Sequence, residues 1–294
     1  MNLPFKLHEH TGSCVPQGPA FSSAKRVNFS IDGNQIEFYA PRHRPEARVT
    51  KARNPDRSYI FKDIIFRTIF DNEVQLEDSW EHSSLFRRCW AFNGPWFTGP
   101  LAELCMSFIL IRPKALNENV SYFHPRAFEQ AMGDYLTNEY GIFKTDGRSN
   151  WIAPKHWQPI KSLPVVAARL QVAPDEIIMF RTTREYIFFP VADQCLVVMS
   201  FNPAQLQGRG TQSERDKVLD RLAMLDLMEG IIDSLKITLS PEVQAQRDRA
   251  LQSLEDTSLI KNFPPMKWTT VEEDALWSSK HPDKPPLDKV LKTG

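Results

Sequence analysis

The stretch that decides the fold is residues 184–239, which read REYIFFPVADQCLVVMSFNPAQLQGRGTQSERDKVLDRLAMLDLMEGIIDSLKITL. Two apolar runs, 186–190 and 195–201, flank a short turn and predict a β-hairpin. A linker that contains glycine then leads into a segment with apolar residues at helical spacing, which ends in Ser234-Leu235-Lys236-Ile237. The stretch therefore predicts a hairpin, a helix and a closing strand. Its residues indicate how the core packs, but they include no nucleophile, ligand cluster or phosphate loop.

Ser213 is placed to cap the predicted helix through the amide of Asp216. One apolar stripe of this helix is expected to face the core. The stripe consists of Val218, Leu222, Leu225, Met228, Ile232 and Leu235. Ser240-Pro241-Glu242 predicts the start of a second, charged helix that continues to Glu255.

Other segments give clear signals of secondary structure. Alternating residues in 27–31 and 35–39, around Asp32-Gly33-Asn34, predict a tight hairpin. Strands are expected at 85–92 and 101–112, and at 165–172 and 177–181 around a turn at 173–175. A helix is expected at 125–138, which has a proline at its first position. Residues 59–70 are ambiguous: the spacing of their apolar residues favours a helix, which we expect, whereas their isoleucine and phenylalanine content favours a strand.

Together these elements predict an α+β fold in which an antiparallel β-sheet has helices packed on its faces. We expect one domain over residues 27–258, an N-terminal extension over 1–26, and a tail rich in proline and tryptophan, 259–294, along the surface. A hairpin followed by a helix occurs twice, so two similar halves, 27–145 and 150–258, remain an alternative.

Composition excludes several classes of protein. Lysine plus arginine equals aspartate plus glutamate at 36 each, so no global field attracts nucleic acid or an acidic membrane. Residues 1–10 lack the apolar core of a secretory signal, which predicts a cytoplasmic protein. Cys89, Cys105 and Cys195 lie in apolar runs, where we expect reduced thiols that behave as small hydrophobic residues.

The chemical motifs are weak. His8, His10 and Cys14 could converge on a transition metal, but a fourth ligand at a definite spacing is missing. Gln207-Gly208-Arg209-Gly210 precedes a helix without the full signature of a phosphate loop. We therefore expect no metal and no cofactor, and a monomer or homodimer.

Two features are candidates for binding a protein partner. Trp96 and Phe97 lie between two Gly-Pro corners, where stiff backbone would present aromatic rings, although the rings could equally cap the core. Asp226, Glu229 and Asp233 recur at helical spacing and form either an acidic patch for a basic partner or a solvated flank of the helix.

The hairpin at 27–39, the loop at 92–99, the Phe188-Phe189-Pro190 hairpin and the helix that runs into 233–237 give a resemblance to a loose family. The family comprises cytosolic immunity proteins encoded beside bacterial antagonistic toxins, such as those delivered by type VI secretion. The resemblance implies a PsbP-like α/β/α sandwich. It also implies stoichiometric inhibition of a cognate toxin, without catalysis and without nucleic-acid or membrane partners.

Two alternatives stay open. One is an enzyme or small-ligand protein whose site is assembled from dispersed residues such as His82, Arg87, His124 and His156. The other is a structural or adaptor protein of a secretion or phage assembly, which would use the tail as a docking arm.

Overall fold

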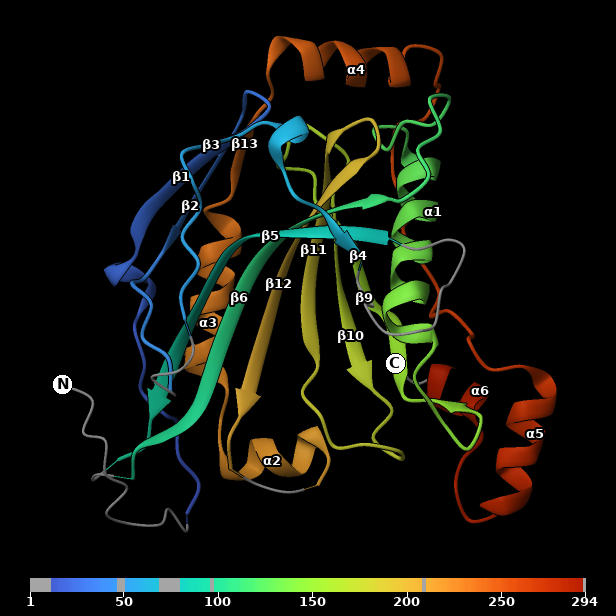
Figure 1. Ribbon diagram of the computed structural model, residues 1–294. Helices are drawn as coiled ribbons and strands as arrows, with labels where there is room; N and C mark the ends of the chain where they lie inside the picture. The colour runs from blue at the N-terminus through green and yellow to red at the C-terminus, as the bar shows by residue number, and fades with distance from the viewer. Residues whose placement is uncertain (1–11, 47–50, 69–79, 96–97, 208–209, 293–294) are drawn as a thin grey trace. The chain divides into compact units, whose positions relative to one another are not determined.

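The computed structural model describes residues 12–46, 51–68, 80–95, 98–207 and 210–292 (Figure 1). The fold is α+β, with 26% of residues in helices and 36% in strands, which confirms the predicted class. The chain forms two compact units. Unit 1 comprises Met1–Ile65, Ser84–Ile109 and Met199–Ser240, and unit 2 comprises Phe66–Ser83, Leu110–Val198 and Pro241–Gly294. Each unit therefore combines segments that are distant in the sequence.

The strands form three sheets. The largest has the order β4-β5-β6-β12-β11-β10-β9, a second has the order β13-β2-β1-β3, and β7 pairs with β8. Their bounds are β1 Lys25–Ile31, β2 Asn34–Ala40, β3 Ser58–Tyr59, β4 Arg67–Thr68, β5 Trp80–Asn93, β6 Pro100–Pro113, β7 Lys144–Thr145, β8 Arg148–Ser149, β9 Trp151–Pro159, β10 Ala168–Pro174, β11 Arg184–Ala192, β12 Cys195–Gln205 and β13 Lys236–Thr238.

Helices and helical turns lie between these strands and beyond both ends of the set. Their bounds are η1 Phe21–Ser23, η2 Phe61–Asp63, α1 Pro125–Leu136, the π-helical turn η3 Thr137–Gly141, α2 Gln212–Val218, α3 Leu222–Asp233, α4 Pro241–Leu251, α5 Val271–Lys280 and α6 Leu287–Lys292. The predicted hairpins β1–β2, β5–β6 and β11–β12, the helix α1 and the closing strand β13 are thereby confirmed.

The core of unit 1 forms around the β1–β2 hairpin. Its turn needs positive φ at Asp32 (44°) and Gly33 (80°), as the aspartate-glycine pair predicts. Phe29 and Phe38 point inward from the two strands and are completely buried. The Phe38 ring stacks on Phe108 of β6 at 4.9 Å between centroids, and Phe29 meets the same ring edge-on at 5.9 Å.

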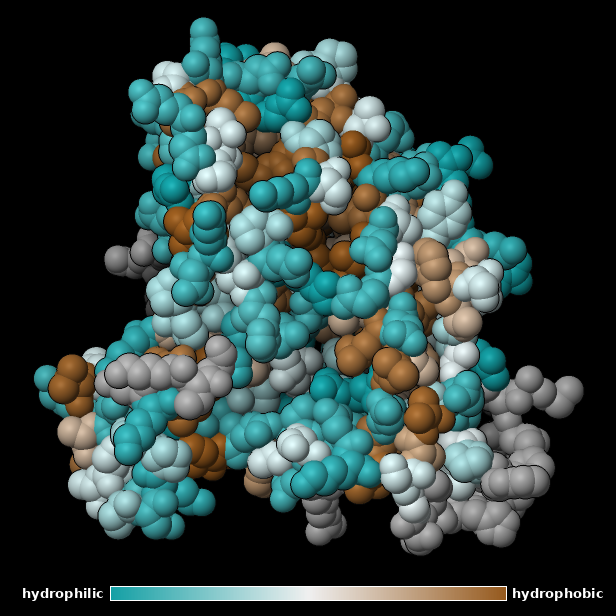
Figure 2. Space-filling model, turned by 180° about the vertical axis from the view of Figure 1, so that it is seen from behind, coloured by the Kyte–Doolittle hydropathy of each residue, from teal (hydrophilic) through white to brown (hydrophobic). Residues whose placement is uncertain are grey.

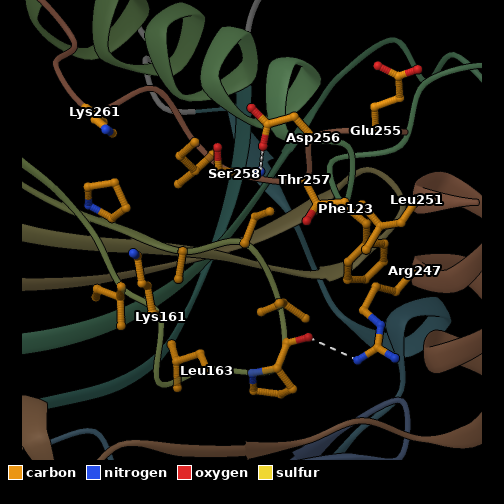
Figure 3. Close-up of a pocket in the computed structure, with 17 residues that line it drawn as sticks. Phe123, Lys161, Leu163, Arg247, Leu251, Glu255, Asp256, Thr257, Ser258 and Lys261 are labelled. Atoms are coloured by element: carbon orange, nitrogen blue, oxygen red, sulfur yellow. Dashed lines mark hydrogen bonds between the residues drawn. The ribbon is translucent and has the colours of Figure 1, made fainter. Parts of the chain in front are cut away.

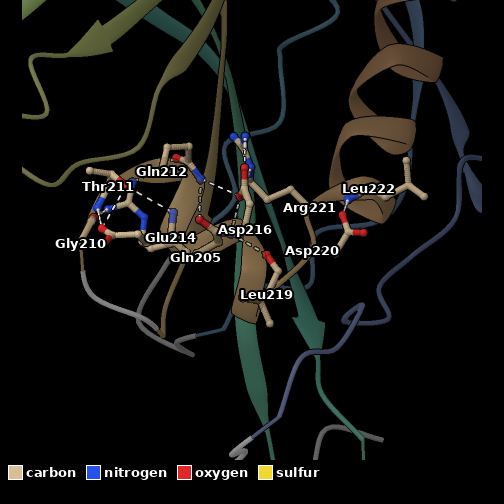
Figure 4. A network of polar contacts seen from close by, with 11 residues as sticks. Gln205, Gly210, Thr211, Gln212, Glu214, Asp216, Leu219, Asp220, Arg221 and Leu222 are labelled. Carbon is tan, nitrogen blue, oxygen red and sulfur yellow. Dashed lines mark hydrogen bonds and ion pairs between the residues drawn. The ribbon is translucent and has the colours of Figure 1, made fainter.

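The single helix predicted from Ser213 is wrong, because the chain breaks between α2 and α3. Thr211, not Ser213, caps α2 through a capping box with Glu214. Figure 4 shows Asp216 at the centre of a polar network beside the break. Both of its oxygens accept hydrogen bonds from Arg221 at 2.9 Å, and Gln205 donates to Asp216 and to the Leu219 carbonyl.

The break also changes which face of the helix is buried. The buried residues of α3 are Met224, Leu227, Met228 and Ile231. Of the predicted stripe, Met228 and Leu235 are buried, whereas Val218 and Leu222 are 40% and 55% exposed. A continuous 3.6-residue period cannot be extended across an interruption, so the predicted stripe fails at its N-terminal end.

Unit 2 has strands β9, β10 and β11 in antiparallel register, with α1 beginning at Pro125 after its cap, His124. The strand predicted at 177–181 is wrong. This segment is a turn in which the Asp175 carboxylate accepts from the Ile177 amide at 3.1 Å. The helix predicted at 59–70 is also wrong, since η2 lies between the two-residue strands β3 and β4.

The C-terminal segment 259–294 contains α5 and α6 and contributes buried side chains to unit 2. Trp277 and Leu287 are each 2% exposed, and Leu259 is 7% exposed. Arg148 of β8 lies with its guanidinium carbon 4.1 Å from the centre of the Trp277 ring. Its Nε donates to Asp175 at 2.6 Å, and its Nη1 donates to the Pro285 carbonyl at 2.8 Å.

The sequence predicts reduced thiols at Cys89 and Cys105, whereas in this structure the two residues form a disulfide across β5 and β6. Their Cα atoms are 4.0 Å apart across the hairpin, a proximity that sequence spacing alone does not reveal. Cys195 is buried and takes no part in a disulfide, as its apolar surroundings predict.

Exposed hydrophobic residues are scattered. The face drawn in Figure 2 is largely hydrophilic, with apolar residues in small groups between polar ones. The largest exposed fractions are those of Ile65 at 75% and Val271 at 72%. In the part of the chain that the structure covers, none of the helices has the length and apolar character needed to cross a bilayer.

Candidate functional site

Unit 2 contains an open cavity of ≈ 570 Å³ (Figure 3). The connection from β9 to β10 forms one wall, and the end of α4 with residues 255–261 forms another. Phe123, Val165 and Leu259 supply buried apolar surface. The Ile160 amide donates to the Ala167 carbonyl at 2.8 Å, which closes the β9–β10 connection at its base.

Charged side chains of both signs surround this cavity. Lys161 and Lys261 lie on one side and Arg247 on the opposite side (Figure 3). Arg247 is held in place, since it donates to the Pro164 carbonyl at 3.0 Å and pairs with Asp248. Hydrogen bonds from Ser258 lower the pKa of Asp256, so this carboxyl stays ionised. The cavity is therefore suited to a ligand that has an apolar part together with one positive and one negative group.

A second cluster in unit 2 contains the carboxyl with the most perturbed protonation among the described residues. Glu139 lies in the π-helical turn η3, and π-helical turns occur frequently at functional sites. Burial raises the pKa of Glu139 to about 7, and the nearby Arg184 opposes this rise. Beside it, the hydroxyls of Tyr140 and Tyr186 form a hydrogen bond, and Arg184 donates to Tyr140 at 3.2 Å.

This cluster has the components of a proton-transfer site. Burial raises the pKa of both Tyr140 and Tyr186, so both phenols keep their protons at neutral pH. A carboxyl with a pKa near 7 exchanges its proton readily at neutral pH. Arg184 also faces the Trp151 ring, with 5.5 Å between the guanidinium carbon and the ring centre. Sequence spacing gives no sign of this cluster, because η3, β9 and β11 are separate elements.

The protonation of Glu139 predicts a specific pH dependence of stability. The pKa is raised in the folded protein, so the folded state keeps a proton that the unfolded state loses between about pH 4.5 and 7. The free energy of unfolding therefore falls as pH rises through this window. We expect Glu139→Gln to remove that slope and to raise the free energy of unfolding at pH 8 by on the order of 2 kcal/mol.

Urea denaturation at several pH values measures this effect. Glu118→Gln, which changes an exposed carboxyl of the same unit, is the matched control and should leave the slope unchanged. A loss of stability at pH 8 in Glu139→Gln would instead mean that the ionised carboxylate stabilises the fold through Arg184.

The aromatic pair expected to bind a partner, Trp96 and Phe97, lies outside the described residues. The flanking backbone forms the turn of the β5–β6 hairpin: the Gly94 amide donates to the Gly99 carbonyl at 3.0 Å. Gly99 has φ of 74°, and a Cβ on Gly94 would collide with Leu101, so both glycines are required here.

The acidic residues Asp226, Glu229 and Asp233 all lie on α3, away from its buried face. Asp226 and Asp233 are exposed, and Glu229 is half-buried. Asp233 is the last residue of the helix. The Ser234 hydroxyl beyond it accepts a hydrogen bond from the Tyr39 amide at 2.9 Å, which fixes the end of α3 against β2.

The remaining candidates that the structure describes are spread over several elements. His8, His10, Gly208 and Arg209 lie outside the described residues. Cys14 is half-buried, and its backbone pairs with Val218 and Asp220. Of the dispersed residues, His124 caps α1 through its Nδ1, His156 is exposed on β9, and Arg87 is exposed on β5. His82 lies on β5 opposite Arg67.

Comparisons of the chain with protein-family models, with curated proteins and with solved structures give no match.

Proposed function

We propose that this protein is an immunity protein that binds a cognate bacterial toxin and neutralises it by stoichiometric occlusion. The proposal rests on the resemblance described above, and the elements that carry it are formed: β1–β2, the β5–β6 turn, β11–β12, and α3 leading into β13. The PsbP-like sandwich is part of the same proposal. We assign the protein to the cytoplasm, where such a toxin would act.

The placement of acidic residues on α3 is the observation that supports this helix as the toxin-binding surface. The C-terminus of a helix carries partial negative charge, so an aspartate there is unfavourable by roughly 0.3 to 1 kcal/mol. Asp233 occupies this position, and Glu229 lies four residues before it with the same charge. Residues that lower local stability are expected at functional surfaces. We infer that α3 offers an acidic face to a basic surface of the toxin.

The β5–β6 turn supplies the second part of the proposed interface. Trp96 and Phe97 would act as apolar anchors, and the acidic residues of α3 would guide association. Both elements belong to unit 1.

Co-expression tests the proposed function. A toxin encoded beside this gene should kill cells when expressed alone, and this protein should restore growth through a complex of equal stoichiometry. A neighbouring toxin that kills equally well in its presence would contradict the proposal.

Charge substitutions on α3 test the surface. We expect Asp226→Asn together with Asp233→Asn to slow association with the toxin about tenfold at low salt, with a smaller effect at high salt. The same pair should raise the free energy of unfolding by about 0.5 kcal/mol, since an unfavourable charge leaves the helix end. Stopped-flow association and urea denaturation measure these two effects.

Glu242→Gln with Glu255→Gln is the matched control. It removes two exposed charges from the α4 region of unit 2. If both double variants slow association equally, net charge and not α3 governs binding.

A second function is favoured by one specific observation. Glu139, with a pKa raised to about 7 beside Tyr140 and Arg184, is suited to acid–base chemistry, which supports the alternative of an enzyme with a dispersed site. Under this alternative, Glu139→Gln would abolish a phenotype of the gene that does not depend on any toxin.

A further inference from the structure

Two strands of unit 1 bring three potential metal ligands together. Cys89 of β5 and Cys105 of β6 form a disulfide, and their Cα atoms are 4.0 Å apart. Glu103 lies two residues before Cys105, so both side chains are on the same face of β6. The two Sγ atoms and a carboxylate oxygen of Glu103 all lie within 4.8 Å of one another.

The Glu103 carboxylate is held toward the sulfurs. Its Oε1 accepts a hydrogen bond from the Glu46 amide at 2.8 Å, and its Oε2 lies 3.3 Å from the Cys105 sulfur. A disulfide sulfur has no proton to donate, so the carboxylate gains no hydrogen bond from it. A thiol proton or a metal cation between oxygen and sulfur would complete this contact. The arrangement therefore suits the reduced pair better than the disulfide.

We propose that the reduced Cys89–Cys105 pair and Glu103 form a binding site for a thiophilic divalent cation, of which Zn²⁺ is the best fit. Zinc takes tetrahedral thiolate and carboxylate ligands, with Zn–S bonds of about 2.3 Å. Tetrahedral geometry then requires about 3.8 Å between the sulfurs. Once the S–S bond is broken, rotation about χ1 of the two cysteines would let the sulfurs separate to this distance.

A monothiol reductant can convert the disulfide into the two thiols that the metal site needs. Two reductant molecules break the Cys89–Cys105 bond, form their own disulfide, and leave one proton on each cysteine sulfur. Zn²⁺ then replaces both protons, which pass to solvent. The cytoplasmic thiol pool keeps most cysteines reduced, so this form would predominate in that compartment.

The surroundings leave the site open on one side. Cys89 is fully buried, whereas Cys105 and Glu103 are only half-buried, so a metal ion and one water ligand can enter from that side. His43 lies behind the site, where its Nδ1 accepts a hydrogen bond from the Cys89 amide at 3.0 Å. The Glu46 amide holds Glu103 in the way that outer-shell partners orient metal ligands.

Anaerobic titration of the full-length reduced protein with zinc, in competition with a chromophoric chelator, tests the proposal. We expect one equivalent of zinc to bind, and the protein oxidised to its disulfide to bind none at this site. Cobalt should give the visible spectrum of a tetrahedral thiolate complex. Cys89→Ser and Cys105→Ser should each weaken zinc binding at least a hundredfold, and Glu103→Gln about tenfold.

Cys14→Ser and Cys195→Ser, which change the two cysteines outside the disulfide, are the matched controls and should leave zinc binding unchanged. The proposal is overturned if the reduced protein binds no stoichiometric zinc, or if the disulfide cannot be reduced in the folded protein. It is also overturned if binding survives Cys105→Ser and is lost on replacing His8 and His10, which would place the metal at the N-terminus.

Discussion

Asp175→Ala should lower the free energy of unfolding by about 3 to 5 kcal/mol, because it leaves the Arg148 charge buried without its counter-ion. Both side chains are completely buried, and Arg148 Nε donates to Asp175 Oδ2 at 2.6 Å. The Asp175 side chain also accepts from the Ile177 amide, so the turn after β10 loses this side-chain hydrogen bond as well, while the Ile178 and Met179 amides keep the Asp175 carbonyl. Thermal and urea denaturation measure the loss.

An exposed ion pair of the same unit provides the control. Asp248 is 57% exposed and pairs with Arg247, so Asp248→Ala should cost less than about 1 kcal/mol. Replacing both buried charges, Arg148→Met with Asp175→Leu, should be less damaging than Asp175→Ala alone, because no unpaired charge remains. Equal losses in Asp175→Ala and Asp248→Ala would show that the buried pair contributes no more than a surface pair.

Local signals in the sequence predicted the hairpins well. The turn at Asp32-Gly33 and the alternation around it lie within Lys25–Ala40, so short-range chemistry fixes β1 and β2. Helix α1 has its proline and its cap in adjacent positions, and it too was predicted. Where the hydrophobic pattern and the turn or capping residues are adjacent, the sequence is sufficient to predict the element.

The predictions that were wrong concern residues whose interacting partners are distant in the sequence. The end of α2 is set by Gln205 and Arg221 around Asp216, and a periodic pattern contains no trace of that network. Asp175 begins a turn because its side chain is committed to Arg148, 27 residues earlier. In the same way, Cys89 and Cys105 meet only because β5 and β6 pair in one particular register.

The candidate sites also divide into features that local sequence predicts and features that depend on distant contacts. The acidic residues of α3 could be listed from helical spacing, but the position of Asp233 as the last residue of the helix is known only from the structure. Glu139 carried no signal at all, because its pKa depends on burial beside β11. Protonation at a site is a property of the packed structure, so sequence spacing cannot supply it.

Trp277→Ala should also cost about 3 to 5 kcal/mol, the usual loss for a buried tryptophan. A tail lying along the surface would be insensitive to this change, but the Trp277 ring is 2% exposed and covers the Arg148 guanidinium at 4.1 Å. The neighbouring residue of the same helix is the control. Leu276 is 55% exposed, so Leu276→Ala should change the free energy of unfolding by less than about 0.5 kcal/mol.

The losses of unfolding free energy caused by Asp175→Ala and by Trp277→Ala should not be additive. Trp277 and Asp175 both act on Arg148, so the double variant Asp175→Ala with Trp277→Ala should lose less than the sum of the single losses. Trp277→Phe keeps a ring over the cation and should retain part of the stability. Additive losses would mean that the C-terminal segment is stabilised independently of the Arg148–Asp175 pair, and that Trp277 contributes through apolar burial alone.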